Sequence, residues 1–396
     1  MTAPPAEDNA EQPAEQPADP PAPTRRRGPL WAKLLIAAGS LLVLVSTSVI
    51  IIDRVLVATV NAKIPQTNLL GNPDTPSPGQ SIVPTHASIN GPVNILLVGI
   101  DERVDQAATD PSRADSIIVL NVPVTHDRAY LVSIPRDTLV DIPADSAAGY
   151  RGGSDKINAA YSVGSSHGLG RAGGFQLLAR TVTQLSGITF NAGMIVNFAG
   201  FQDLVGALGG VDMCVDERTI SVHIGHDAQG RYAVPYDLSG GSPVPIRGVT
   251  PQVYEVGCQH LAAWQALDYV RQRELLADGD YGRQRHQQQF LKAVFAEALR
   301  SGVLTNPSRL STVMAAAGKA FTVDTGGIGI DDWVYAMRDI GPSDVVTLKT
   351  NGGQFDSTTS GGVAYEHLNE TSMALLKAVA GDTVDTFVTA HPDWVS

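Results

Sequence analysis

Hydrophobic residues are spaced along the chain in two ways that predict strands and helices. Short runs rich in β-branched residues and bounded by turn residues predict strands at 94–100, 116–122 and 129–134, and two further strands are expected at 345–350 and near 363–368. Apolar residues at helical spacing predict helices at 157–163, 175–185, 198–208, 261–270, 282–300, 310–320 and 372–379. Because strands and helices alternate, we expect an α/β fold, with α+β as the alternative, in which helices flank a central mixed sheet.

One apolar run is long enough to cross a membrane. Residues 34–52 carry no charge, and at ~1.5 Å per residue they span about the ~30 Å hydrocarbon core of a bilayer. Basic residues precede the run at 25–27 and at Lys33, which places the preceding tail in the cytoplasm and the rest of the chain outside. We therefore predict one transmembrane anchor at 31–53, with a cleaved signal peptide or a buried core helix as the alternatives.

Composition divides the remainder of the chain. Residues 1–30 begin with a stretch dominated by Pro, Ala, Glu and Gln, which predicts a disordered cytoplasmic tail. Residues 54–90 contain a Pro-, Gly- and Ser-rich stretch without apolar periodicity, which suits an extracytoplasmic linker. We expect one folded domain at 91–384, with hairpins and loops between 216 and 257, and a short tail at 385–396.

The overall charge and the cysteines exclude some classes of protein. A net charge of −12 argues against nucleic-acid binding, so any anion site must be local. The two cysteines, Cys214 and Cys258, do not have the spacing of a zinc finger or a Cys-x-x-Cys motif. On the predicted topology both lie in an oxidising compartment, which predicts a disulfide between them; two buried free thiols are the alternative.

Two well-known catalytic patterns overlap in one glycine-rich segment. Residues 164–168 match the G-x-S-x-G nucleophile elbow, and residues 168–173 match the dinucleotide-binding pattern G-x-G-x-x-G. Neither pattern directly follows a predicted strand, which both functions require. We therefore interpret the segment as a flexible glycine-rich loop.

Charged and polar residues gather at the ends of the predicted elements. They follow or precede the first three strands and stand where two helices meet: Asp101, Arg103, Arg113, Asp115, Arg136, Arg271, Arg273, Asp280, Arg283 and Gln287. Guanidinium groups bind phosphate oxygens through paired donors, so converging arginines without matching carboxylates point to a phosphate ligand with two or three charges. Aspartates among them would hold Mg²⁺ against that ligand. Surface ion pairs and helix capping are the alternative interpretation.

The chain resembles the LytR-CpsA-Psr family over roughly residues 91–382. The resemblance rests on an ordered set of motifs: 94–101, 113–122, Ser-Ile-Pro-Arg-Asp-Thr at 133–138, Lys-Ile-Asn-Ala-Ala-Tyr at 156–161, Gly-Gly-Val-Asp at 209–212, Ala-Leu-Asp-Tyr-Val-Arg-Gln-Arg at 266–273, and 280–290. It implies a phosphotransferase with one anchor and an extracytoplasmic α/β domain in the cell membrane. Such an enzyme moves a glycopolymer from a polyprenyl-pyrophosphate carrier, whose chain lies in an apolar pocket, to peptidoglycan.

The resemblance also implies roles for particular residues. Asp101 and Asp115 match aspartates on the Mg²⁺ side of the site, and with Arg136 they form the implied catalytic set. The implied pyrophosphate-binding set is Arg103, Arg113, Arg136, Arg271, Arg273, Arg283 and Gln287, and Asp280 matches an acidic position of the last motif. The chain departs from the family pattern at His286, where many members have arginine, and in a longer segment at 164–174 that would affect access of the acceptor.

The residues leave two other functions open. A charged clamp beside an apolar pocket can bind a lipid-linked glycan without any reaction, as a scaffold protein does. The same clamp in a pyrophosphatase would use water as the acceptor. Aspartates among the arginines favour catalysis, because binding alone needs no metal.

Overall fold

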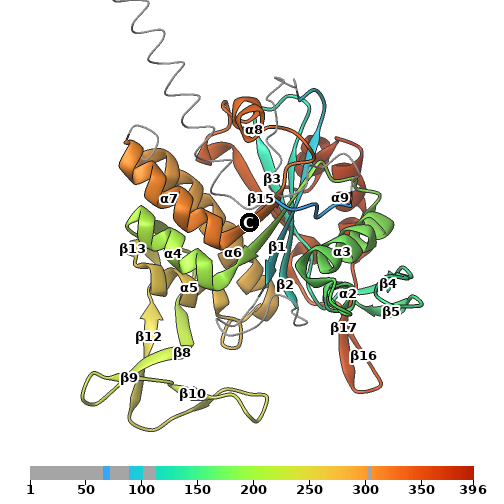
Figure 1. The fold of residues 1–396 in the computed structure, drawn as a ribbon. Coiled ribbons are helices and arrows are strands. Elements are labelled where there is room, and N and C mark those ends of the chain that lie inside the picture. Colours follow the sequence, from blue (N-terminus) through green and yellow to red (C-terminus); the bar gives the residue numbers. More distant parts are fainter. Residues whose placement is uncertain (1–65, 72–88, 101–112, 302–305) are drawn as a thin grey trace, which may run out of the picture. The chain divides into compact units, whose positions relative to one another are not determined.

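The computed structural model describes residues 66–71, 89–100, 113–301 and 306–396 (Figure 1). All of them belong to one compact unit, Leu56–Ser396. The predicted anchor at 31–53 lies outside the described residues. Within the described ranges, no helix combines the length and the apolar character that a membrane span requires.

The central element is a sheet with the strand order β14-β6-β1-β2-β3-β15. Neighbouring strands pair antiparallel in β14–β6, β1–β2 and β2–β3, and parallel in β6–β1 and β3–β15. The sheet is therefore mixed, which confirms the predicted fold class. Its strands are β1 (Val93–Ile100), β2 (Ala114–Val122), β3 (Ala129–Ser133), β6 (Ala192–Asn197), β14 (Phe321–Asp324) and β15 (Val345–Lys349).

Helices cover both faces of this sheet because alternate residues of its strands point to opposite sides (Figure 1). On β1, Leu96 and Val98 pack into the core beneath α2 (Ile157–Gly164), α3 (Gly170–Ser186), α9 (Glu370–Ala380) and α10 (Val384–Ala390). Ile95 and Leu97 face the other core, beneath α6 (Gly279–Arg300) and α8 (Ile330–Ala336).

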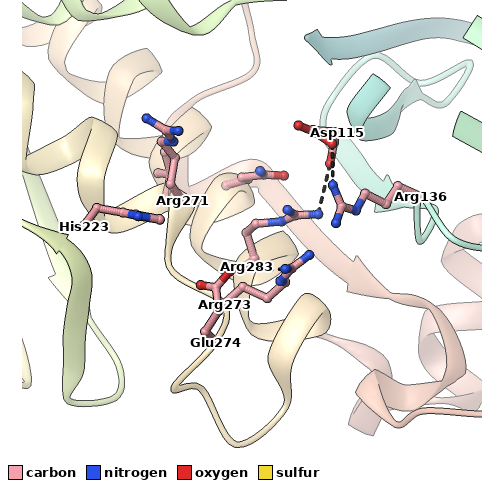
Figure 2. Close-up of a pocket in the computed structure, with 9 residues that line it drawn as sticks. Asp115, Arg136, His223, Arg271, Arg273, Glu274 and Arg283 are labelled. Atoms are coloured by element: carbon pink, nitrogen blue, oxygen red, sulfur yellow. Dashed lines mark hydrogen bonds and ion pairs between the residues drawn. The ribbon is translucent and has the colours of Figure 1, made fainter. Parts of the chain in front are cut away.

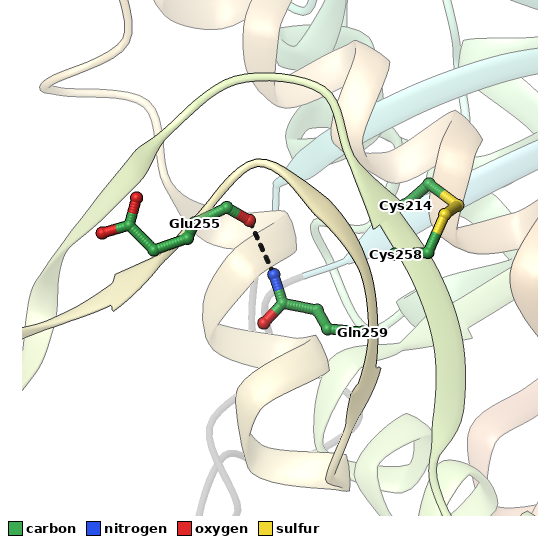
Figure 3. The surroundings of a disulfide bond; sticks show 4 residues. All are labelled: Cys214, Glu255, Cys258 and Gln259. Atoms are coloured by element: carbon green, nitrogen blue, oxygen red, sulfur yellow. Dashed lines mark hydrogen bonds between the residues drawn. A yellow bond between two sulfur atoms is a disulfide. The ribbon is translucent and has the colours of Figure 1, made fainter.

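A third core lies beside the sheet, and the disulfide is on its exposed side. It is formed by α4 (Phe198–Leu208), α5 (Ala263–Arg271), α6, β7 (Val211–Val215) and β13 (Gly257–Leu261), while α7 (Pro307–Ala320) packs on α4. Cys214 and Cys258 are direct partners in the β7–β13 ladder and are joined by the predicted disulfide (Figure 3). The chain between them, expected as hairpins and loops, forms β8 (Thr219–Asp227), β9 (Tyr232–Ala233), β10 (Tyr236–Asp237), β11 (Val244–Pro245) and β12 (Val249–Tyr254).

Short elements complete the fold. The hairpin of β4 (Leu139–Ile142) and β5 (Gly153–Lys156) precedes α2, and the hairpin of β16 (Ser357–Ser360) and β17 (Val363–Glu366) precedes α9. The 3-10 helices are η2 (Pro342–Asp344), η3 (Thr350–Gly353) and η4 (Pro392–Trp394).

The glycine-rich segment is not the flexible loop that we expected. Residues 165–169 form a short turn, and α3 already begins at Gly170. A Cβ atom on Gly164 would lie 2.5 Å from the carbonyl oxygen of Gly173, and one on Gly174 would lie 2.8 Å from that of Tyr161. The glycines are therefore required because α2 and α3 cross in close contact.

Two segments that we expected outside the domain pack against it. The predicted tail at 385–396 contains most of α10 and the buried Trp394 of η4. Within the predicted linker, Leu69 is fully buried, and its amide donates a hydrogen bond of 2.8 Å to the carboxylate of Asp324. The described domain is therefore wider at both ends than the hydrophobic pattern indicated.

Candidate active site

Antiparallel pairing brings the first charged residues together at one edge of the sheet. Ile100 pairs with Ala114, and Ile118 pairs with Ser133, so the start of β2 lies beside the ends of β1 and β3. Asp115 is the second residue of β2, and Arg136 follows β3 by three positions. The Arg136 Nη1 atom donates to the Asp115 Oδ1 atom, and both side chains are about four-fifths buried (Figure 2).

Helix α6 is held across the same edge by a buried glutamine. The Gln288 Nε2 atom donates to the carbonyl oxygens of Leu131 and Leu348, at 3.2 and 3.0 Å, and to Ser133 Oγ at 2.9 Å. Because these acceptors belong to β3 and β15, the first turns of α6 are fixed over the strand ends. Arg283 in these turns donates to the carbonyl oxygen of Asp115 at 3.2 Å.

These elements surround a cleft of about 170 Å³ (Figure 2). The cleft receives side chains from β2, β8, α6, the end of α5 and the segments after α5 and β3: Asp115, Arg136, His223, Val270, Arg271, Arg273, Glu274, Arg283 and Gln287. Four arginines thus face two carboxylates, and the lining is positive. An anion with more than one charge is the ligand that such a lining favours.

The arginines do have matching carboxylates, contrary to our expectation from the sequence. Arg136 pairs with Asp115, and Arg273 Nη2 lies 3.2 Å from Glu274 Oε1. Arg283 Nη2 lies 2.5 Å from Asp280 Oδ1. The pairs explain how so many cations are tolerated together in a protein without a bound anion.

Burial and neighbouring charges shift the pKa values of Arg136 and Arg283 in opposite directions. Burial disfavours the charged form of Arg136, but Asp115, Asp280 and Asp137 outweigh it and raise the pKa of the guanidinium. For Arg283 burial dominates and lowers the pKa, although Asp280 opposes it. An anionic ligand would therefore stabilise the charged form of Arg283 in particular.

Several buried polar atoms of the cleft have no hydrogen-bond partner within the described part of the chain. They are Nε of Arg136, Nε of Arg283, Oε2 of Glu274 and Oε1 of Gln287. Most buried polar groups in proteins are paired. A cluster of unpaired ones at a positive cleft is typical of a ligand-binding site.

Six of the predicted residues meet in this cleft: Asp115, Arg136, Arg271, Arg273, Arg283 and Gln287. Arg113 is exposed immediately before β2 and does not line the cleft. Asp101 and Arg103 lie outside the described residues. His223 and Glu274 were missed. The position of Glu274 next to Arg273 was a signal that could have been used, whereas His223 belongs to a segment whose strands the sequence did not define.

An apolar pocket adjoins the charged cleft. It lies between the sheet and helices α4 to α6, and its lining is almost entirely hydrophobic: Leu97, Gly99, Ser116, Ile118, Met194, Val196, Phe201, Val270, Gln287, Phe290, Leu291 and Phe321. Val270 and Gln287 line both cavities. A ligand with a charged head and an apolar chain could therefore occupy the two together.

Two residues between Arg283 and Gln287 on α6, Arg285 and His286, do not line the cleft. Arg285 forms ion pairs with Asp216, at 2.6 Å, and with Glu217 and Asp278. His286 is fully buried and stacks on Tyr269 with 4.1 Å between the ring centroids. Burial lowers the pKa of His286 to about 4, so the ring is neutral at physiological pH. Both side chains have structural roles.

The described residues can contribute to a magnesium site but do not form a complete one. Among them, no three His, Cys, Asp or Glu side chains are grouped so that they could hold a metal ion. Mg²⁺ is commonly bound by one or two carboxylates, water and the phosphate oxygens of a substrate. The carboxylate of Asp115 at the cleft fits that requirement.

Comparison with known proteins places the chain in a family. The chain is 33% identical over 215 residues to the polyisoprenyl-teichoic acid–peptidoglycan teichoic acid transferase TagU of Bacillus cereus, a match that covers 54% of this chain and 55% of TagU. It is 32% identical over 244 residues to the probable cell wall biosynthesis protein LcpB of Corynebacterium glutamicum, covering 59% of this chain and 48% of LcpB. The chain thus spans about half the length of these relatives.

The fold and a family model agree with this placement. The crystal structure of TagV from B. subtilis has the same fold, with a TM-score of 0.52 and 22% identity over 75% of this chain and 98% of TagV. The model of the LytR_cpsA_psr family matches residues 60–379. The chain therefore belongs to the LytR_cpsA_psr family.

Proposed function

We propose that the chain is a phosphotransferase that moves a glycopolymer from a polyprenyl-pyrophosphate carrier onto peptidoglycan. The observation that carries this proposal is that an arginine-lined cleft adjoins an apolar pocket and shares two lining residues with it, Val270 and Gln287. The cleft suits a diphosphate and the pocket suits a prenyl chain. The name of the relative TagU, a polyisoprenyl-teichoic acid–peptidoglycan teichoic acid transferase, supports the same reaction class.

The arginines act by holding the diphosphate and stabilising its transition state. A hydroxyl oxygen of the acceptor attacks the phosphorus that carries the glycan, and the bond from this phosphorus to the bridging oxygen breaks. The bridging oxygen leaves with polyprenyl phosphate, on which negative charge develops. Arg136, Arg273 and Arg283 lie where they can neutralise that charge with fixed donors.

A magnesium ion is part of the proposal. Asp115, together with Asp101, would hold it, and when bound it would further neutralise the diphosphate. The arginines and the apolar pocket perform the binding and orientation of the donor.

We also propose that the domain works outside the cytoplasm, anchored at 31–53. Folding of the domain with a Cys214–Cys258 disulfide suits an oxidising compartment. An alkaline phosphatase reporter fused after Ser396 should be active in cells. A green fluorescent reporter that matures only in the cytoplasm should be dark at the same position, and the reverse pattern would contradict this topology.

The reaction can be tested with the purified full-length chain in detergent micelles. The donor is a synthetic polyprenyl pyrophosphate that carries a labelled glycan, and the acceptor is a peptidoglycan oligomer. We expect labelled peptidoglycan and polyprenyl phosphate in equal amounts. Polyprenyl phosphate with free glycan phosphate, regardless of the acceptor, would instead identify a pyrophosphatase. Donor binding without any product would identify a binding protein.

A further inference from the structure

Strand β8 contains a large bulge next to the cleft. The strand pairs with β12 through Ile220–Val253 and again through Gly225–Pro251. Residues 221–224 of β8 therefore stand opposite Gln252 alone. Bulges of this kind turn side chains away from the regular alternation of a strand, and they are common beside active sites.

A buried serine fixes the conformation of the bulge. The Ser221 Oγ atom donates to Asp268 Oδ1 at 2.9 Å. It accepts hydrogen bonds from the backbone amides of His223, at 3.1 Å, and Ile224, at 2.8 Å. These amides lack partners on β12 because of the bulge, and Ser221 satisfies them instead.

The same network fastens the bulge to helix α5. Asp268 on α5 is buried and also accepts from Tyr254 Oη, at 2.7 Å, and from Gln272 Nε2, at 2.8 Å. The Gln272 Oε1 atom accepts from the backbone amide of Val222 at 2.9 Å. Arg271 is the last residue of α5 and Arg273 follows it, so the network fixes the position of β8 relative to these two arginines of the cleft.

The side chain that this arrangement presents to the cleft is His223. Its ring lies beside Arg271 and across the cleft from Asp115 and Arg136 (Figure 2). Burial, followed by the charge of Arg271, lowers the pKa of His223; Asp268 and Glu274 oppose this shift, and Arg273 adds to it. His223 is therefore neutral at pH 7 and has a nitrogen lone pair that can accept a proton.

The other groups of the cleft that could accept a proton are engaged with arginines. Asp115 is paired with Arg136, and Glu274 is paired with Arg273 through Oε1, while its Oε2 atom is buried. Within the described residues, the ring of His223 makes no such ion pair or hydrogen bond. It is thus the cleft-lining group best suited to meet a hydroxyl that arrives from solvent.

We propose that His223 is the general base for transfer, a role that rests on the proposed function. Its imidazole takes the proton from the acceptor hydroxyl while the hydroxyl oxygen forms the new bond to phosphorus. The bond from this phosphorus to the bridging oxygen breaks, and polyprenyl phosphate keeps the electron pair. The imidazolium then releases its proton to solvent, which restores the starting state.

The test compares His223→Asn with His226→Asn in the full-length chain. His226 lies on the same strand but is exposed and does not line the cleft, so it is a matched control. General-base catalysis typically contributes about 10²- to 10⁴-fold. We expect kcat to fall by roughly that factor in His223→Asn and to stay within about twofold in His226→Asn. The Kd for polyprenyl pyrophosphate, measured by calorimetry, should not change in either variant.

Two further readouts separate a base from a structural histidine. In the unchanged protein kcat/KM, which reports the ligand-free enzyme, should decline as pH falls through a pKa below 6.5, and this acidic limb should be missing in His223→Asn. Added imidazole should restore part of the activity of His223→Ala. Ser221→Ala, which releases the bulge, should lower kcat but keep the acidic limb, because the base itself is still present.

Specific results would overturn the role of His223. Normal turnover by His223→Asn would do so, and so would a weaker Kd for polyprenyl pyrophosphate that accounts for the whole loss of activity. The role would also be overturned by two results together. These are a correctly folded His223→Ala that imidazole does not rescue, and a His223→Asn that keeps the acidic limb of the pH profile. Absence of product with the unchanged protein would instead contradict the proposed function itself.

Discussion

Arg273 offers the clearest separation of ligand binding from folding in the cleft. Its side chain is 35% exposed, and its ion pair at 3.2 Å is with its own neighbour in sequence, Glu274. Partly exposed pairs of this kind contribute about 0 to 1 kcal/mol to stability. One kcal/mol corresponds to about 2 to 4 °C in Tm for a domain of 150–250 residues, and less for a larger one. Arg273→Ala should therefore lower Tm by no more than roughly 3 °C.

The expected effect on activity is much larger. A hydrogen bond to a charged group contributes about 1.5 to 3 kcal/mol. Since 1.4 kcal/mol is a factor of about ten, loss of the Arg273 contact with a diphosphate should reduce kcat/KM by roughly 10- to 100-fold or more. Two charges brought together in a partly buried cleft are screened less than in water, so the upper part of this range is the expected one.

The assay measures transfer to peptidoglycan and thermal unfolding on the same preparations. Arg231→Ala is the control, because Arg231 is 75% exposed and pairs with Asp227 on the protruding strands. Arg136→Ala should lose activity and also melt earlier than Arg273→Ala, because it leaves the partly buried Asp115 without its partner. If Arg273→Ala melts several degrees early but its folded fraction keeps normal specific activity, the arginine is structural and the proposed site is wrong.

Three further predictions concern stability. Reduction of the Cys214–Cys258 disulfide, which closes a sequence separation of 44, should cost roughly 3 to 4 kcal/mol. Thiol labelling of denatured, unreduced protein should find no free thiol, and two free thiols would contradict the bond. In the folded protein the pKa of His286 is about 4, so the ring stays neutral down to about that pH. In the unfolded chain the ring takes up a proton below about pH 6.5. Stability should therefore fall between pH 6.5 and 4, by roughly 3 kcal/mol from this group, and His286→Phe should flatten that part of the denaturant-derived profile; an unchanged slope would refute the assignment. Gly173→Ala places a Cβ 2.5 Å from a backbone oxygen, whereas Gly206→Ala meets nothing closer than 4.0 Å. The first should destabilise by at least about 1 kcal/mol and the second should stabilise slightly, and equal effects in thermal melts would contradict the close crossing of α2 and α3.

The elements with strong local patterns could be predicted from the sequence. Strands β1 and β2 are rich in β-branched residues, β3 is a short apolar run, and α6 begins and ends near the expected residues. Strand β6 was missed although it is an inner strand of the sheet, between β14 and β1. It starts with Ala192 and Gly193, and the ring of Phe175 occupies the place of the missing side chain at Gly193. The packing partner that makes this segment a strand is distant in sequence and is not visible in a local pattern.

In the site, too, features set by local sequence could be predicted, and features set by contacts distant in sequence could not. Arginines at strand and helix ends indicated a common edge, and six of the predicted residues meet there. Their carboxylate partners could not be assigned, because Asp115 meets Arg136 only through the register of β2 and β3. His223 was hidden for a related reason. Its position depends on the bulge of β8 and on the buried contacts of Ser221 with Asp268, which join residues 47 positions apart.

The central claim is that one ligand occupies the arginine cleft and the apolar pocket together. A crystal structure of the domain soaked with a polyprenyl pyrophosphate tests it most directly. We predict density for the diphosphate in contact with Arg136, Arg273 and Arg283, continuous with density for the chain beyond Val270 and Gln287. A diphosphate bound elsewhere on the domain, or a prenyl chain outside the pocket between the sheet and α4 to α6, would contradict the account.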